Sequence, residues 1–204
     1  ALMNHEGIAT ILATGGNAMV KAAYSCGKPA LGVGAGNVPA YVEKSANIRQ
    51  AAHDIVMSKS FDNGMVCASE QAVIIDKEIY DEFVEEFKSY HTYFVNKKEK
   101  ALLEEFCFGA KANSKNCAGA KLNPNIVGKS AVWIAEQAGF TVPEDTNILA
   151  AECKEVGEKE PLTREKLSPV IAVLKSEDTE DGLKKARQMV EFNGPGNSAA
   201  IHTK

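Results

Sequence analysis

The sequence predicts an α/β fold built around a mostly parallel sheet, and three stretches indicate it. Within the first 33 residues, two short apolar segments flank a glycine turn and an amphipathic segment. An apolar-periodic segment then leads through a polar loop into Gln71-Ala-Val-Ile-Ile75, and Pro169-Val-Ile-Ala-Val-Leu174 precedes another helical pattern. Strands that alternate with helices are typical of βαβ units, whose strands lie parallel.

The first βαβ unit is predicted from residue 9 to residue 33. Residues 9–13 form a strand, Thr14-Gly-Gly16 a turn, residues 17–26 a helix that Gly27 ends, and residues 29–33 a second strand. The glycine-rich stretch Gly32-Val-Gly-Ala-Gly-Asn37 follows. It can let the backbone approach a phosphate or a cofactor ring, or it can be a plain loop. It is a weak dinucleotide fingerprint, because a strand and not a helix comes next.

The rest of the chain continues the alternation of helices and strands. Polar residues 153–164 are expected to form a solvated loop. The expected elements are strands over 40–42, 71–75, 147–151, 169–174 and 199–202, and helices over 47–58, 98–106 and 128–138, over a stripe from Ile79 to Phe87 capped by Asp76, and over 177–191 capped by Ser176.

Composition narrows the class of protein. The 204 residues are 45% hydrophobic and 25% charged with a net charge of −4, as in an ordinary globular chain without the basic stripe that nucleic acid requires. No apolar run approaches the about 20 residues of a membrane helix, and no signal pattern opens the chain, so neither membrane insertion nor export is expected. The chain stops on a predicted strand, which is typical of a piece of a larger protein.

The cysteines indicate a reduced, cytoplasmic setting without metal. Their number, five, is odd, they form no Cys-x-x-Cys pair, and the four histidines are scattered, so neither a disulfide framework nor a zinc site is indicated. Cys67 lies in Phe61-Asp-Asn-Gly-Met-Val-Cys-Ala-Ser-Glu-Gln71, between a helix and a strand. A thiol on such a connection can reach substrate while the scaffold fixes its position, which makes Cys67 a candidate nucleophile. The alternative is an unreactive core thiol.

The chain closely resembles the aldehyde dehydrogenase superfamily, specifically the CoA-acylating acetaldehyde dehydrogenases and the aldehyde dehydrogenase half of bifunctional enzymes. The resemblance covers essentially all 204 residues, and the motif around Cys67 is its most specific part. The matching stretches are Ile11-Leu-Ala-Thr-Gly-Gly16, Gly27-Lys-Pro-Ala-Leu-Gly-Val-Gly-Ala-Gly-Asn37, Ser58-Lys-Ser-Phe-Asp-Asn-Gly-Met-Val-Cys-Ala-Ser-Glu-Gln71 and Glu165-Lys-Leu-Ser-Pro169.

The resemblance implies a fold and a set of roles. Residues 1–37 look like the tail of a NAD-binding domain, and residues 38–204 look like a three-layer catalytic domain that carries the thiol. Cys67 matches the nucleophile, Gly16 and Gly34 match positions that line the nicotinamide half of NAD, and Glu165 matches the glutamate that binds the nicotinamide ribose. From the residues alone, Glu165 would be a surface carboxylate in a charged loop.

The implied reaction converts a small aldehyde, CoA and NAD to acyl-CoA and NADH through a thioester on Cys67. Hydrolytic relatives carry a general-base glutamate in a Glu-Leu-Gly-Gly context, where this chain has Gly32-Val33-Gly34. In one departure from the family pattern, Gly194-Pro-Gly-Asn197 replaces the usual Gly-x-Gly-His, and imidazole can hold a proton where an amide cannot. A hydrolytic dehydrogenase, or a non-catalytic assembly piece of a homo-oligomeric enzyme, remains the alternative.

Overall fold

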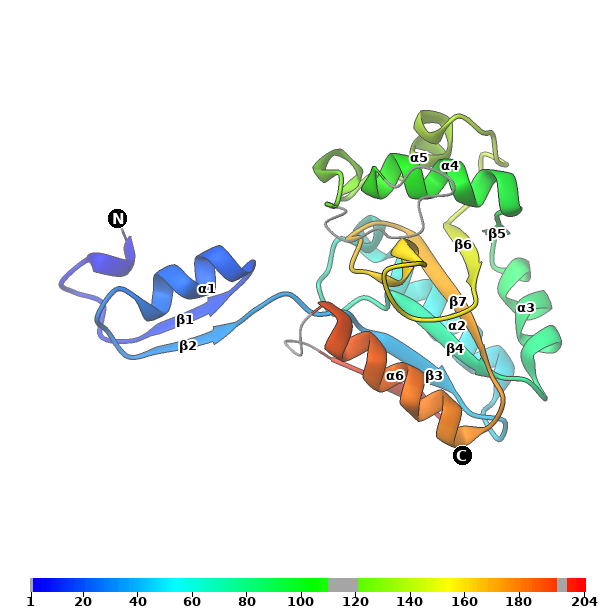
Figure 1. Cartoon of the computed structure of the whole chain (residues 1–204), viewed down its shortest axis with the longest axis horizontal. Helices are drawn as coiled ribbons and strands as arrows, with labels where there is room; N and C mark the ends of the chain where they lie inside the picture. The colour runs from blue at the N-terminus through cyan, green and yellow to red at the C-terminus, as the bar shows by residue number, and fades with distance from the viewer. Residues whose placement is uncertain (1, 110–120, 194–197) are drawn as a thin grey trace.

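The structure is a computed structural model, and it describes residues 2–109, 121–193 and 198–204. Two groups of strands and helices are joined by an extended segment (Figure 1). The elements are η1 (Leu2–Asn4), β1 (Ile11–Thr14), α1 (Asn17–Tyr24), β2 (Ala30–Val33), β3 (Pro39–Val42), α2 (Ile48–Ser60), η2 (Phe61–Gly64), β4 (Ala72–Asp76), α3 (Tyr80–Ser89), β5 (Thr92–Phe94), α4 (Lys97–Phe108), η3 (Pro124–Ile126), α5 (Ala131–Ala138), β6 (Ile148–Cys153), η4 (Pro161–Thr163), β7 (Val170–Ser176), α6 (Thr179–Asn193) and β8 (Ala200–His202).

The amino-terminal group is the predicted βαβ unit. β1 and β2 pair in parallel, with Ile11 opposite Ala30 and Thr14 opposite Val33, and α1 connects them. Because both strands run toward the larger group, their carboxyl ends and the glycines that follow lie on the side that faces it (Figure 1). The assignment of residues 1–37 and 38–204 to two domains stays a prediction.

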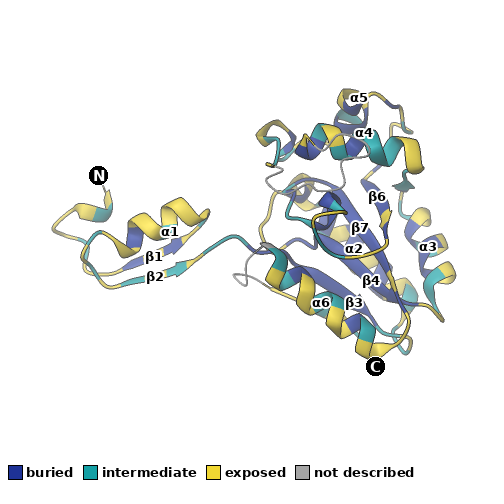
Figure 2. Ribbon diagram, in the orientation of Figure 1, coloured by how far each residue is buried: buried dark blue, intermediate teal, exposed yellow. Residues whose placement is uncertain are grey.

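The larger group is a three-layer structure around one parallel sheet, as predicted. The strand order is β5-β6-β7-β4-β3-β8, and every neighbouring pair is parallel. One hydrophobic cluster joins the sheet to α2 and α3, and a second joins its other face to α4, α5 and α6. The central strands β4, β6 and β7 are almost completely buried (Figure 2), as expected of a sheet covered on both faces.

The helices form where apolar stripes and capping residues coincide. In α3 the stripe residues Phe83 and Phe87 are fully buried. Asn96 forms a capping box with Glu99 at the start of α4, and Ser130 caps α5 by accepting the backbone N–H of Trp133 at 3.3 Å. Gly139 ends α5 in the left-handed region with φ +95, as a glycine at this position commonly does.

Two predicted caps are wrong for the same reason. Asp76 and Ser176 do not cap the helices that follow them, because each is the last, buried residue of a strand. The Asp76 carboxylate accepts hydrogen bonds from Tyr41 and Ser176, both at 2.8 Å, and from the backbone N–H of Lys44 at 3.0 Å. A buried carboxylate requires such partners, so these side chains join β3, β4 and β7 at their carboxyl ends.

Three further features differ from prediction: a missed strand, the start of a helix and a loop. Strand β5, Thr92–Phe94, follows α3 directly and was not predicted from its three residues. The helix expected from residue 128 begins at Ala131, because Gly128 has φ +69. The expected solvated loop over 153–164 is partly wrong, since Pro161–Thr163 is a buried 3₁₀ turn and Glu160 pairs with Lys100. No helix in the described part of the chain is long and apolar enough to cross a bilayer.

Candidate active site

Cys67 lies on a tightly folded loop between η2 and β4. Asp62, Asn63 and Gly64 are consecutive residues in the left-handed region, with φ 49, 51 and 68, so the chain reverses sharply just before the thiol. An added Cβ on Gly64 would lie 2.5 Å from the carbonyl oxygen of Ser168, a separation that only glycine allows. Backbone packing therefore holds the Cys67 loop against the segment just before β7.

The loop is also held by hydrogen bonds to distant segments. The Asn63 side chain donates to the carbonyl oxygen of Gly128 at 3.0 Å, and the Gly128 N–H donates to the carbonyl oxygen of Leu167 at 3.1 Å. Leu167 itself has φ 48, which is uncommon for a residue with a side chain. Strain of this kind marks a candidate functional segment, because the surrounding contacts must stabilise it.

Among the cysteines that the structure describes, Cys67 is the exposed one. Cys26 is half-buried, and its Sγ donates to the carbonyl oxygen of Ala23 at 2.9 Å. Cys107 and Cys153 are buried. Burial raises the pKa of both Cys107 and Cys153 to about 12, so these two thiols stay protonated and inert at neutral pH. Cys117 lies outside the described residues. Exposure thus favours Cys67 as the nucleophile.

Glu165 lies at the same edge of the large sheet as Cys67. Cys67 precedes β4 and Glu165 precedes β7, and these two strands are parallel neighbours, so both residues are at the amino edge. The Glu165 side chain is half-buried. Burial raises its pKa above the ordinary value, and a hydrogen bond from the Gly36 backbone opposes that shift. The Gly36 contact brings Glu165 to the segment that joins the two sheets.

The two predicted glycines flank that segment from the small sheet. Gly16 follows β1 and Gly34 follows β2, and these strands end side by side. A Cβ on Gly34 would meet the Asn17 side-chain oxygen at 3.0 Å, whereas a Cβ on Gly16 would meet nothing within 4 Å. Packing within the described chain therefore restricts Gly34 but leaves open space above Gly16, at the ends of parallel strands where such sheets hold ligands.

Two buried lysines contact Gln71 at the end of the Cys67 loop, and neither was predicted from the sequence. The Lys166 Nζ donates to the carbonyl oxygens of Gln71 at 3.0 Å, Leu162 at 2.6 Å and Arg164 at 2.8 Å. Burial lowers the pKa of Lys166 to about 7, while three carbonyl acceptors favour the ammonium form. Lys166 thus ties the exit of the Cys67 loop to the turn that carries Glu165.

Lys59 is the second buried lysine, on α2. Its Nζ lies 3.4 Å from the side-chain oxygen of Gln71, and burial lowers its pKa well below the ordinary value. A signal for it was present in the sequence, because position 59 continues the apolar stripe of Ala52, Ile55 and Val56 at helical spacing. Lys166 gave no comparable signal, since it lies in a charged stretch on no helical stripe and its contact with Gln71 joins residues 95 positions apart.

The last predicted motif is placed only in part. Residues 194–197, including Asn197, lie outside the described residues. His202 ends β8 opposite Val42, at the carboxyl edge of the large sheet and therefore on the side away from Cys67. In the described part of the chain, no three His, Cys, Asp or Glu side chains group as metal ligands would.

The aldehyde dehydrogenase family model matches residues 1–204, so the chain belongs to the aldehyde dehydrogenase family. Across its whole length it is 93% identical to an aldehyde-alcohol dehydrogenase of Streptococcus pneumoniae serotype 4 and 46% identical to the bifunctional aldehyde-alcohol dehydrogenase of Escherichia coli K12. It covers 23% and 22% of those proteins, so it spans less than a quarter of their length.

Solved structures agree with this assignment. An acetylating aldehyde dehydrogenase from Geobacillus thermoglucosidasius superposes with a TM-score of 0.90 at 43% identity, over 100% of this chain and 43% of that one. A propionaldehyde dehydrogenase from Rhodopseudomonas palustris with bound propionyl-CoA has a TM-score of 0.82 at 30% identity, over 99% of this chain and 42% of that one. The family and the fold predicted from the sequence are confirmed.

Proposed function

We propose that this chain is the thiol-bearing part of a CoA-acylating aldehyde dehydrogenase, and that Cys67 is its nucleophile. The observation that carries the proposal is an exposed thiol on a loop fixed from three sides, at the same sheet edge as Glu165. Relatives named for acetylating activity, and a neighbour solved with propionyl-CoA, support CoA as the acyl acceptor.

The residues fit a nicotinamide dinucleotide at the junction of the two sheets. The half-buried Glu165 carboxylate would accept hydrogen bonds from ribose hydroxyls, and the space above Gly16 leaves room for the cofactor at the ends of β1 and β2. When bound, the cofactor accepts a hydride. A similar structure of an engineered glycolyl-CoA reductase holds NADP⁺. We infer NAD for this chain from its likeness to the aldehyde-alcohol dehydrogenases.

Cys67 performs the covalent chemistry. Its thiolate adds to the aldehyde carbonyl carbon, which forms a carbon–sulfur bond and places the negative charge on oxygen. When that oxygen re-forms the carbonyl, the carbon loses a hydride and a thioester remains on Cys67. The CoA thiolate then attacks the thioester carbon, the bond to Cys67 breaks, and the Cys67 thiolate leaves. Each step is reversible, so acyl-CoA and NADH would return the aldehyde.

The decisive experiment measures NADH formation from acetaldehyde by the full-length protein, with and without CoA. We expect formation to require CoA and to be abolished in Cys67→Ser, while Cys26→Ser, which removes a half-buried thiol, serves as the matched control and stays active. Equal turnover without CoA would reject the acylating assignment. Loss of activity in Cys26→Ser alone would reject Cys67 as the nucleophile.

Hydrolysis is the second candidate, and Glu165 is the observation that favours it. Its pKa is raised by burial, which is the property of a general base that could activate water. At residues 32–34, where hydrolytic relatives carry their base, this chain has no carboxylate, and Gly32 packs so closely that a Cβ would lie 2.6 Å from Val20. Acetate formation without CoA would establish the hydrolytic reaction, and its loss in Glu165→Gln at saturating NAD would assign Glu165 as the base.

A further inference from the structure

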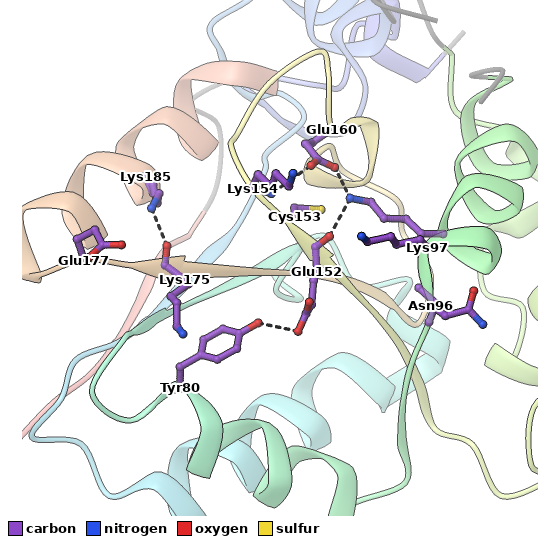
Figure 3. A pocket seen from close by; sticks show the side chains of 12 residues that line it. Tyr80, Asn96, Lys97, Glu152, Cys153, Lys154, Glu160, Lys175, Glu177 and Lys185 are labelled. Atoms are coloured by element: carbon purple, nitrogen blue, oxygen red, sulfur yellow. Dashed lines mark hydrogen bonds and ion pairs between the residues drawn. The ribbon is translucent and has the colours of Figure 1, made fainter. Parts of the chain in front are cut away.

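A second pocket lies at the opposite edge of the large sheet. It has a volume of about 760 Å³ and opens at the carboxyl ends of β5, β6, β7 and β4 (Figure 3). Cys67 and Glu165 precede β4 and β7, whereas the pocket residues Glu152, Lys175 and Tyr80 lie at or beyond the ends of β6, β7 and β4. The length of the strands therefore separates the two sites.

The pocket sits where the topology of the sheet opens a crevice. β4 leads to α3 on one face of the sheet, and its neighbour β7 leads to α6 on the other face. Adjacent strands whose connections leave in opposite directions form a topological switch point, the position at which open parallel sheets hold ligands. Tyr80 at the start of α3 and Lys185 on α6 line the pocket from its two sides (Figure 3).

The carboxylates of the pocket are already partnered. Glu160 accepts from the Lys100 side chain and, at 3.1 Å, from the Lys154 backbone N–H. Glu152 accepts from the Tyr80 hydroxyl at 3.1 Å, and Glu177 pairs with Lys77 at 3.0 Å. Five lysines and three glutamates line the pocket of a chain whose net charge is −4. Two of the lysines are also partnered, since Lys100 pairs with Glu160 and Lys185 pairs with Asp181 at 2.6 Å.

Three of the pocket lysines form no ion pair among the described residues, so their ammonium groups are free to bind an anion. Lys97 on α4, Lys154 after β6 and Lys175 on β7 have no ion-pair partner among the described residues, and all three are exposed. The Lys175 Nζ lies over the Tyr80 ring, 4.5 Å from its centroid. These cations come from three separate parts of the chain and line one pocket, so they give it positive charge from more than one side.

We propose that this pocket binds a small phosphorylated molecule. Lysine ammonium groups bind phosphate as point charges, and the volume is within the range of about 300–1,000 Å³ typical of small-molecule sites. The Tyr80 ring and Val95 give the wall an apolar part that an organic group would contact. The site shares no residue with the Cys67 loop, so the proposal stands apart from the dehydrogenase chemistry.

Calorimetric titration of the full-length protein tests the proposal, with inorganic pyrophosphate and ADP as probes in saturating NAD and CoA. The first variant replaces Lys97, Lys154 and Lys175 by alanine. A matched control replaces Lys21, Lys121 and Lys184, which are exposed and outside the pocket. Loss of three charge contacts predicts about tenfold weaker binding in the pocket variant. The control variant loses the same net charge at sites outside the pocket, and solvent ions screen such distant charges, so its affinity should stay within about twofold of the parent.

The outcomes separate clearly. Binding of either probe that weakens only in the pocket variant supports the site, and tighter binding of ADP than of pyrophosphate identifies an organic phosphate. The single variant Lys154→Glu should weaken both probes as well, with an unchanged melting temperature, because its Nζ has no partner to lose in the described structure. Absence of binding by both probes in saturating NAD and CoA, or equal weakening in the two triple variants, would overturn the proposal.

Discussion

Replacing Gly64 by alanine tests whether close backbone contact holds the Cys67 loop. Gly64 has φ +68, and an added Cβ would lie 2.5 Å from the Ser168 carbonyl oxygen and 3.0 Å from that of Lys59. The left-handed conformation costs a residue with a side chain about 1–2 kcal/mol, and overpacking costs about 1–3 kcal/mol more. We expect Gly64→Ala to lower the free energy of unfolding by about 2–5 kcal/mol.

Gly139→Ala is the matched control for this prediction. Gly139 also has a left-handed φ of +95, but a Cβ added there would meet nothing within 4 Å. Gly139→Ala therefore carries the conformational cost without the steric clash. Urea unfolding measures both variants, and the difference between them isolates the contact with Ser168. The shifted backbone should also slow alkylation of Cys67 by iodoacetamide. Equal stability of the two variants, with unchanged alkylation, would refute the close-contact argument.

Three further predictions concern buried and half-buried charges. Glu165→Gln should raise the KM for NAD about tenfold or more, because a neutral amide loses a charge-assisted hydrogen bond to ribose; steady-state kinetics measure this, and an unchanged KM would contradict it. Burial lowers the Lys166 pKa to about 7 from an ordinary 10.5, so the unfolded chain binds more protons between these values, and stability from this group rises with pH across that window. Lys166→Met should therefore flatten the rise of the urea midpoint between about pH 7 and about pH 10, and parallel profiles in both proteins would contradict it. Asp76→Ala leaves three donors without their acceptor and should cost about 3 kcal/mol or more, measured by urea unfolding, with a cost under about 1 kcal/mol as the contrary result.

Local patterns predicted most elements because the patterns reflect burial. The stripe of α3 and the continuous apolar runs of β4 and β7 pack directly against the core. Residues close together in the sequence therefore show the pattern of burial, and a local pattern is enough to predict these elements. Asp76 and Ser176 were predicted wrongly because their partners lie far away in sequence. A hydrogen bond between residues 100 positions apart leaves no local signal, and both residue types are common helix caps.

The sequence predicts which edge of the sheet holds the candidate site, but not which strands and side chains pack around it. Cys67 and Glu165 each precede an apolar strand, so a parallel sheet places both at one edge, and the sequence is sufficient for that conclusion. The adjacency of β4 and β7 is not, because the intervening strands β5 and β6 could follow several orders. The role of Lys166 depends on that adjacency, since the turns it joins meet only when these two strands pair.

The two proposed sites lie at opposite edges of the large parallel sheet. A thiol at the amino edge is unusual for an open α/β sheet, whose ligands normally bind at the carboxyl edge. In the proposed function the carboxyl ends of β1 and β2 supply the ligand-binding edge, and the segment that contains Gly36 joins it to the amino edge of the large sheet. The carboxyl edge of the large sheet is consequently left unused by the thiol chemistry. Because the buried strands β4 and β7 separate the two edges, substitutions among the exposed pocket lysines should leave alkylation of Cys67 unchanged.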